Sequence, residues 1–292
     1  MNQLEKLFDV PGPRGKRKLA IINTTGLVFI LLIAVALVWV LVEKDQLSAN
    51  KWKPIFTVDV WKEYLLPGLW GTIKAAVIAI VTSNIFGIVL GIGRLSPIAP
   101  IRWFSGIVVE FFRAVPVLVI MIFFYFSLSQ LSLKADWLDS ANAPFYGVIL
   151  GLTLYNGSVI AELVRSGVYN LPRGQREAGM AIGLTHGQTL QHVELPQALV
   201  AMMPAMVSQL VVILKDTALG YIVVYPELLR QAKLVGTTYV NLLPALVVAA
   251  LMFITVNTLL GMAAHGLSAR LNQRTSAPAD ELADPGLLVD AD

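Results

Sequence analysis

The stretch EAGMAIGLTHGQTLQHVELP, from Glu177 to Pro196, is a polar segment with turn residues, and it lies between two long apolar runs. The whole chain is 56% hydrophobic and 14% charged, whereas a soluble domain is about half apolar and about a quarter charged. The mean hydropathy of +0.70 agrees with this comparison. The composition indicates an integral membrane protein, in which such a polar segment marks a place where another molecule docks.

Apolar windows of about 20 residues predict membrane-spanning helices, because a helix needs that length to cross about 30 Å of hydrocarbon. The apolar run from Ile21 to Val42 follows basic residues but is too long for a signal peptide and lacks a small-residue cleavage site, so it is a retained anchor. The predicted fold is all-α and polytopic. Its six predicted spans are 22–42, 68–92, 104–131, 144–164, 197–223 and 241–264.

The distribution of Lys and Arg predicts that both termini are cytoplasmic. With the N-terminus inside, the inner segments hold 12 of the 22 basic residues, the outer segments hold 7 and the spans hold 3. This orientation places the Glu177–Pro196 segment in the cytoplasm. In the outer loop, WKEYLLP (Trp61 to Pro67) has the composition of an interfacial helix, and a plain loop is the alternative.

Several classes of chemistry are excluded by what the sequence lacks. There is no cysteine and therefore no disulfide or thiolate ligand, and the three histidines are scattered outside any HExxH frame. No phosphate-binding GxxxxGK[ST] motif is present: at Gly15-Lys16 the first glycine is replaced by Val10, and Arg17 follows the lysine. We therefore expect no metal, no cofactor and no ATPase site in this chain.

The polar segment predicts a first short helix that ends at a glycine. Pro172 and Gly174 end the extension of the fourth span, and the residues from Gln175 to Ile182 then form the helix. Gly183 suits the left-handed position that follows a helix C-terminus.

A second short helix follows directly. Thr185 and Gln188 fit a capping box, and the helix continues to Val193 until Pro196 interrupts the pattern. Two helices that meet at a glycine form a protruding elbow. Small apolar residues on one side of the elbow allow another protein to approach closely: Ala178, Met180, Ala181 and Ile182.

Two other interpretations of the elbow remain to be weighed. Its spacing is similar to that of a helix-turn-helix, which binds DNA. Arg173 and Arg176 are balanced by Glu177 and Glu194, however, so no basic surface is left for phosphates. We expect no nucleic acid partner, and a merely structural connection between two spans is the remaining alternative.

Ionisable residues inside the spans indicate function by default, because their burial in hydrocarbon is costly. Arg113 lies nine residues into the third span, which is about 14 Å at 1.5 Å per residue. Pro116 frees backbone carbonyls nearby. Arg113 either contacts the pathway or substrate, or pairs structurally with Glu162 or Asp216.

The fourth span carries further polar residues. Asn156 is either a pocket residue or an interhelical hydrogen-bonding group, and Ser158 shares a helix face with Glu162. Glu162 and Arg165, three residues apart, predict a local ion pair that anchors the elbow. Gly87 and Gly91 form a GxxxG pattern in the second span, whose expected use is close helix packing.

The spacing of the elbow residues resembles the EAA loop of ABC importer permeases: EAA, three residues, G, nine residues, I, any residue, LP. Gly179 replaces the third alanine, and Val193 replaces isoleucine. In this family the loop forms a coupling helix that docks on the ATPase. The resemblance assigns ATPase coupling to Glu177, Ala178, Gly179, Ile182, Gly183, Leu195 and Pro196.

Longer segments are similar to the polar amino acid branch of this family, the histidine, glutamine, glutamate and arginine permeases. They are EFFRAVPVLVIMIFFYF (110–126), LYNGSVIAELVRSGVYNLPRGQREA (154–178), LPQAL (195–199) and LKDTALG (214–220). The resemblance covers residues 66–265 and is strongest to actinobacterial glutamate-uptake permeases. Where the family often has FFRGTP, Val115 replaces the threonine.

The resemblance implies a domain organisation. The family core has five spans, so the first predicted span is an added N-terminal helix. The expected parts are a basic cytoplasmic N-terminus (1–21), the added helix (22–42), an external loop (43–67), the importer transmembrane domain (68–267) with its coupling loop (170–196), and a disordered acidic cytoplasmic tail (268–292).

The same resemblance implies partners and a pocket. A second permease chain, identical or different, completes the pathway in the bacterial plasma membrane, a separate ATPase dimer holds ATP and Mg²⁺, and a solute-binding protein delivers substrate. The LKDT segment lines the pocket: Asp216 receives the substrate ammonium, Lys215 a carboxylate and Thr217 a hydrogen bond. Because Lys215 and Asp216 point about 100° apart, they serve different partners, and an interhelical salt bridge is the alternative.

The leading interpretation is therefore a non-enzymatic permease subunit that carries a polar amino acid, with glutamate the expected substrate and with Arg113, Asn156 and Ser158 as further pocket residues. The alternative is an ion-coupled secondary transporter or channel, in which Arg113, Asp216 and Lys215 form a relay. No inverted repeat is evident in the sequence.

Overall fold

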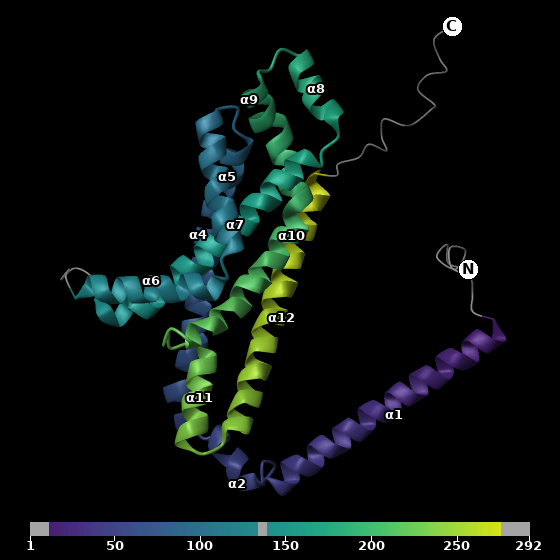
Figure 1. Cartoon of the computed structure of the whole chain (residues 1–292), viewed down its shortest axis with the longest axis vertical. Coiled ribbons are helices and arrows are strands. Elements are labelled where there is room, and N and C mark those ends of the chain that lie inside the picture. The colour runs from purple at the N-terminus through teal and green to yellow at the C-terminus, as the bar shows by residue number, and fades with distance from the viewer. Residues whose placement is uncertain (1–11, 134–138, 276–292) are drawn as a thin grey trace.

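A computed structural model describes residues 12–133 and 139–275, and every regular element in these residues is helical (Figure 1). The long helices are α1 (Pro13–Glu43), α4 (Leu66–Leu95), α5 (Ala99–Ala114), α6 (Val117–Ser132), α7 (Ala143–Tyr169), α10 (Leu195–Asp216) and α12 (Leu242–Thr275). The shorter elements are α2 (Ala49–Trp52), η2 (Lys53–Phe56), α3 (Val58–Val60), η3 (Trp61–Leu65), η4 (Ser140–Asn142), α8 (Arg173–Ala181), α9 (His186–Thr189), η5 (Leu190–Glu194), η6 (Thr217–Tyr221) and α11 (Leu228–Thr238).

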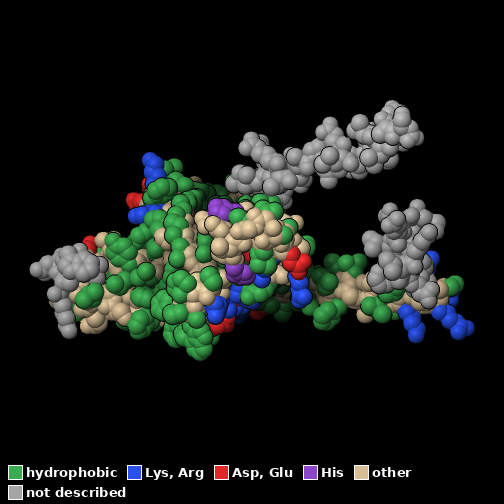
Figure 2. Space-filling model, turned by 90° about the horizontal axis from the view of Figure 1, so that it is seen from above, with side chains coloured by type: hydrophobic (Ala, Val, Ile, Leu, Met, Phe, Trp, Pro, Cys, Tyr) green, Lys and Arg blue, Asp and Glu red, His purple; other side chains and the backbone are tan. Residues whose placement is uncertain are grey.

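The predicted all-α, six-span architecture is confirmed. Within the described residues, five helices are long and apolar enough to cross a membrane, and α5 with α6 supply a sixth span if the bent pair is one span. The surface agrees with this assignment, because hydrophobic side chains cover most of the bundle seen from the end that carries α8 and α9 (Figure 2).

The third span differs from its prediction as one continuous helix over residues 104–131. It is broken between α5 and α6, which are bent by 100°. Pro116 has no N–H to donate and restricts the residue before it to extended backbone, and Val115 accordingly has φ −89° and ψ 128°. The apolar runs before and after the break together have the composition of one span despite Glu110 and Arg113, so hydropathy did not indicate the break and Pro116 did.

The centre of the bundle is the contact between α4 and α7. A Cβ added to Gly87 would lie 2.6 Å from the Gly157 carbonyl oxygen, and one added to Gly91 would lie 2.8 Å from the Val164 Cβ. The predicted use of the GxxxG pattern for close packing is therefore confirmed. Around this contact, apolar side chains from several helices form the main core cluster, including Ala79, Met121, Leu152 and Ile213.

The outer segment around Trp61–Pro67 forms neither a separate interfacial helix nor a loop. It continues through α3 and the π-helical turn η3 directly into α4, so that one helical stretch runs from Val58 to Leu95. Val60 and Leu65 are fully buried against residues of α11 and α12. This packing makes the segment the first part of the second span, at the end of the bundle that carries α11.

The ends of the chain differ from each other. Helix α1 has no buried residue and extends away from the bundle (Figure 1). Helix α12 continues to Thr275, so residues 268–275 are helical and the prediction that the disordered tail begins at 268 is wrong for them. The rest of the predicted tail, 276–292, and residues 1–11 lie outside the described residues.

Candidate functional site

The elbow begins with α8, which ends as the sequence predicts. Gly183 has φ +90°, a conformation that glycine adopts readily. Its N–H donates to the Met180 carbonyl oxygen at 3.0 Å, and the Leu184 N–H donates to the Gly179 carbonyl oxygen at 3.2 Å. These two bonds are the Schellman pattern that satisfies the last carbonyls of a helix.

The start of α8 requires a correction. Pro172 lies at the N-cap of α8, and Gly174 is inside the first turn, whereas the sequence predicted that both residues end the preceding helix. That helix, α7, already ends at Tyr169. A proline at or near the first turn is tolerated because the N–H groups there have no partner within the helix, and a single glycine lowers helix propensity by only about 1 kcal/mol.

The second part of the elbow has the predicted capping box. The Thr185 N–H donates to Gln188 Oε1 at 2.9 Å, and the Gln188 N–H donates to Thr185 Oγ1 at 3.4 Å. Pro196 does not interrupt this helix, because it occupies the first turn of α10. The π-helical turn Leu190–Glu194 precedes it, so the helical path continues from His186 to Tyr221.

An ion pair holds the two parts of the elbow together. Arg176 Nε donates to Glu194 Oε1 at 2.7 Å, and Glu194 is 3% exposed. Gln197 Nε2 donates to Gln175 Oε1 at 3.1 Å and supplies a second link. The opposite charges of Arg176 and Glu194 were the one signal of this pair in the sequence, because Glu194 occupies a variable position of the loop pattern.

The exposed side of the elbow carries apolar side chains beside charged ones, and its inner side is closely packed. Ile182 is 79% exposed, and Glu177 and Ala178 are also exposed. Gly179 is buried. A Cβ added to Gly179 would lie 2.7 Å from Thr189 Cγ2, so the glycine allows α8 to approach α9 closely.

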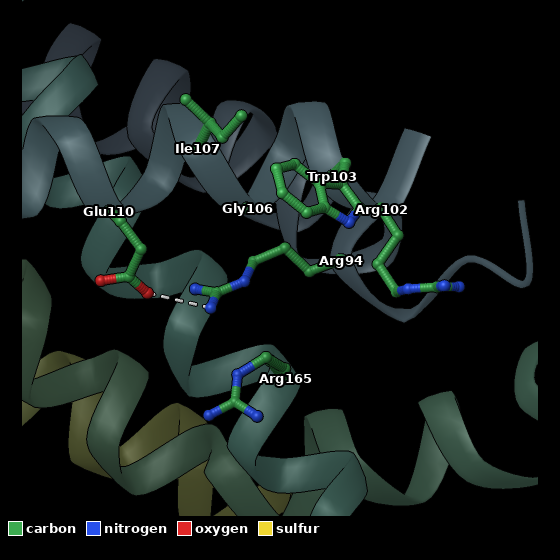
Figure 3. A pocket seen from close by; sticks show the side chains of 7 residues that line it. All are labelled: Arg94, Arg102, Trp103, Gly106, Ile107, Glu110 and Arg165. Carbon is green, nitrogen blue, oxygen red and sulfur yellow. Dashed lines mark hydrogen bonds and ion pairs between the residues drawn. The ribbon is translucent and has the colours of Figure 1, made fainter. Parts of the chain in front are cut away.

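An ion-pair cluster lies at the same end of the bundle and joins α4, α5 and α7. Arg94 donates to Glu110 at 2.9 Å (Figure 3). It also donates to Glu162 at 2.7 Å. Glu162 also pairs with Arg165, as predicted, with Nε at 3.1 Å. Arg113 lies 3.6 Å from each carboxylate, so of its two expected partners the structure brings Glu162 to it. Arg94 was missed, since the sequence identified it only as a charge at the end of a span.

A buried polar contact joins α7 and α10. Asn156 is fully buried, donates to the Leu152 carbonyl oxygen at 3.1 Å and accepts a hydrogen bond from Gln209 at 2.7 Å. The Asp216 carboxyl group lies beside the Asn156 amide. The structure thus brings together Asn156 and Asp216, and it adds Gln209, which sequence reasoning missed.

The remaining predicted pocket residues make other contacts. Lys215 lines a different cavity of about 480 Å³, between α10 and α12, with Asn257 and Thr258. The hydroxyl group of Ser158 donates to the Leu154 carbonyl oxygen of the same helix, and that of Thr217, at the start of η6, donates to the Leu214 carbonyl oxygen of α10. Lys215 and Asp216 therefore serve different surroundings, as their helical spacing predicted.

This bundle of long apolar helices, with a short-helix elbow between α7 and α10, defines a multi-pass membrane permease. Residues 83–273 match the family of binding-protein-dependent transport system inner membrane components, and the chain belongs to that family. The predicted resemblance to polar amino acid permeases is confirmed by the relatives described next.

The chain is 46% identical over 212 residues to the glutamate transport system permease protein GluD of Corynebacterium glutamicum, covering 73% of this chain and 76% of the relative. It is 32% identical over 210 residues to the probable glutamine ABC transporter permease protein GlnP of Bacillus subtilis, covering 71% and 93%. It is also 32% identical over 174 residues to the glutamate/aspartate import permease protein GltK of Escherichia coli, covering 59% and 78%.

Solved structures support the same fold. A chain of an amino acid ABC transporter crystallised with histidines has a TM-score of 0.62 at 22% identity, with 73% of this chain and 95% of that chain covered. A chain of the inward-facing MetNI methionine ABC transporter has a TM-score of 0.59 at 19% identity, with coverage of 70% and 95%. The chain is thus a multi-pass permease subunit of the amino acid ABC importer type.

Proposed function

We propose that this permease carries glutamate, that a second permease chain completes the pathway, and that a separate ATPase drives transport by binding the elbow. The observation that carries the proposal is the 46% identity to a glutamate transport permease over 212 residues. The proposal places the elbow and both termini in the cytoplasm. A solute-binding protein delivers the amino acid from outside. The first predicted span, around α1, is an addition to the family core.

The elbow supports the assignment of ATPase coupling. Its exposed apolar surface, centred on Ile182, is what a protein groove binds. The Arg176–Glu194 ion pair links α8 to the start of α10. A movement of the docked ATPase is therefore transmitted to α10 in two ways, through this ion pair and through the continuous backbone of the elbow.

The polar residues of α7 and α10 support an amino acid pathway. We assign the Asn156–Asp216 contact to the substrate ammonium group and Lys215 to a carboxylate, because each offers the complementary charge or hydrogen bond. Thr217 and Ser158 have hydroxyl groups that already donate to backbone oxygens, so they contribute as acceptors. Arg113 supports the inner end of the pathway through its pairs with Glu110 and Glu162.

The test is reconstitution of the permease with its ATPase and solute-binding protein in proteoliposomes. We expect glutamate to stimulate ATP hydrolysis and to be taken up more strongly than glutamine, arginine or histidine, with no uptake when ATP is absent. Uptake that runs on an ion gradient alone, without ATP, would instead establish an ion-coupled secondary transporter.

The elbow assignment has its own variant. Ile182→Asp is expected to weaken ATPase association about ten-fold, because it places a charge in an apolar contact. Val240→Asp is the matched control, since Val240 is 77% exposed and Ile182 is 79% exposed. Val240 lies in the turn that follows α11, and α11 and α8 lie at opposite ends of the bundle (Figure 1). Unchanged ATPase association in Ile182→Asp, and also after deletion of Gln175 to Leu184, would refute the assignment.

A further inference from the structure

A cavity of about 540 Å³ opens beside the ion-pair cluster, and none of the residues assigned to ATPase coupling or to substrate binding lines it. Its walls come from the ends of α4 and α7 and from one side of α5. Figure 3 shows the side chains around the opening, with the Trp103 ring above the stem of Arg94 and with Arg165 on the other side. Both arginines and Arg102 line the cavity.

The cavity has surplus positive charge. Arg94 and Arg165 donate to the same carboxylate oxygen, Glu162 Oε2, at 2.7 and 3.1 Å. Among the residues that the structure describes, Arg94, Arg113 and Arg165 together face two carboxylates, those of Glu110 and Glu162. One positive charge of the cluster is therefore left unbalanced.

Arg102 adds a second positive charge. Its guanidinium group donates to the backbone carbonyl oxygens of Ser96 and Pro97, at 2.9 and 3.3 Å. It makes no ion pair within the part of the chain that the structure describes. A net charge of about +2 at the end of membrane helices is stabilised by an anion more than by water alone.

The other wall of the cavity is apolar and continues onto the outer face of α5. Trp103 is 71% exposed and Ile107 is 59% exposed, and both line the cavity. Phe104 and Phe111 extend the same exposed apolar surface along the helix. Tryptophan is characteristic of the boundary between headgroups and acyl chains, so the charged and apolar walls match the two parts of a lipid.

We propose that this cavity binds an anionic phospholipid, with the phosphate beside Arg94, Arg102 and Arg165 and the acyl chains against Trp103 and Ile107. A zwitterionic lipid brings no net charge and leaves the surplus unbalanced. The site therefore selects phosphatidylglycerol over phosphatidylcholine, in the leaflet on the elbow side. The selection does not depend on which amino acid is carried.

The test uses the full-length permease in nanodiscs that contain both lipids. We expect brominated phosphatidylglycerol to quench tryptophan fluorescence more than brominated phosphatidylcholine does, and Trp103→Phe to remove that difference. Native mass spectrometry is expected to show about five-fold less retained phosphatidylglycerol for Arg102→Gln, since one basic residue near a headgroup changes binding by about that factor. Arg173→Gln, at an exposed position of the elbow, is the control and is expected to retain the wild-type amount.

Three results would overturn the proposal. The first is a lack of lipid selectivity, shown by equal retention of the two lipids by the wild-type protein or by wild-type retention in Arg102→Gln. The second is complete displacement of the lipid by inorganic phosphate, which would define a site for free anions. The third is complete displacement by the purified ATPase, which would assign this surface to the motor protein.

Discussion

At the residue scale, Gly179 shows why this elbow departs from the alanine typical of its loop pattern. Its Cα lies so close to α9 that an added Cβ would be 2.7 Å from Thr189 Cγ2. Thr189 is fully buried and its hydroxyl donates to the Thr185 carbonyl oxygen at 3.1 Å, so it cannot move aside freely. The glycine and the threonine are therefore complementary, and each constrains the other.

We expect Gly179→Ala to destabilise the elbow by up to about 2 kcal/mol, because overpacking costs about 1–3 kcal/mol and improved helix propensity returns about 1 kcal/mol. The measurement is hydrogen exchange of the α8 amides. Gly174→Ala is the matched control in the same helix, since nothing lies within 4 Å of its added Cβ. Thr189→Ser removes the opposing methyl group and is expected to rescue Gly179→Ala, and equal exchange in both alanine variants would contradict the explanation.

A second residue-scale prediction concerns Glu227, which lies outside the membrane spans. It is fully buried, and its carboxylate accepts hydrogen bonds from the N–H groups of Leu229 and Arg230 at 2.7 and 2.6 Å. Burial is the main cause that raises its pKa from 4.5 to about 7, and these hydrogen bonds partly oppose the shift. The folded state therefore favours the protonated carboxyl group.

Because the folded pKa is above the unfolded pKa, this contribution to stability is fully present below about pH 4.5 and is lost as the pH rises to about 7. We expect the start of α11 to open more readily by up to about 3 kcal/mol over this range, with no further loss above about pH 8. Hydrogen exchange of the α11 amides as a function of pH measures the free energy of this opening. Glu227→Gln is expected to flatten the profile, whereas the exposed control Glu63→Gln leaves it unchanged; a flat wild-type profile would count against the explanation.

At the element scale, the bend between α5 and α6 is the main feature that hydropathy did not predict. Pro116 indicates a break, but the 100° angle depends on the packing of α6 against α7 through Met121 and Gly151, where an added Cβ would lie 2.4 Å from Met121 Cγ. Such contacts join residues about thirty positions apart along the chain, and no local pattern encodes them.

We expect Pro116→Ala to allow an additional backbone hydrogen bond and to reduce the bend. Electron paramagnetic resonance distances between spin labels on α5 and α6 measure the change, with Pro196→Ala, in the first turn of α10, as the control for a proline that causes no kink. An unchanged distance distribution in Pro116→Ala would show that side-chain packing alone holds the bend.

The features that were predictable from sequence have local causes. The Schellman ending at Gly183 and the capping box at Thr185 follow from residue types within a few positions of each other, and the spans follow from the length of apolar runs. The Arg176–Glu194 pair joins residues 18 positions apart, and Gln209 reaches Asn156 across 53 positions. These contacts depend on how the elements pack, which is why the site was predicted only in part.

At the scale of the whole molecule, α1 is attached to the bundle by chain connection and not by packing. None of its residues is buried, whereas α4 and α7 bury glycines against each other. Deletion of residues 1–43 is therefore expected to change the thermal stability of the remaining bundle by no more than about 0.5 kcal/mol. Differential scanning fluorimetry in detergent measures it, and a large fall in melting temperature would show that α1 folds onto the bundle.

The continuous helical path from His186 to Tyr221 also has a mechanical consequence. This path connects the elbow to the membrane interior without a break. The π-helical turn Leu190–Glu194 keeps the chain helical up to Pro196, in the first turn of α10. Pro204 lies inside α10, between the elbow and Gln209, and its missing N–H leaves that turn more compliant than the rest. A force applied at the elbow therefore acts as a torque about Pro204, and the Gln209–Asn156 hydrogen bond lies on the far side of that pivot.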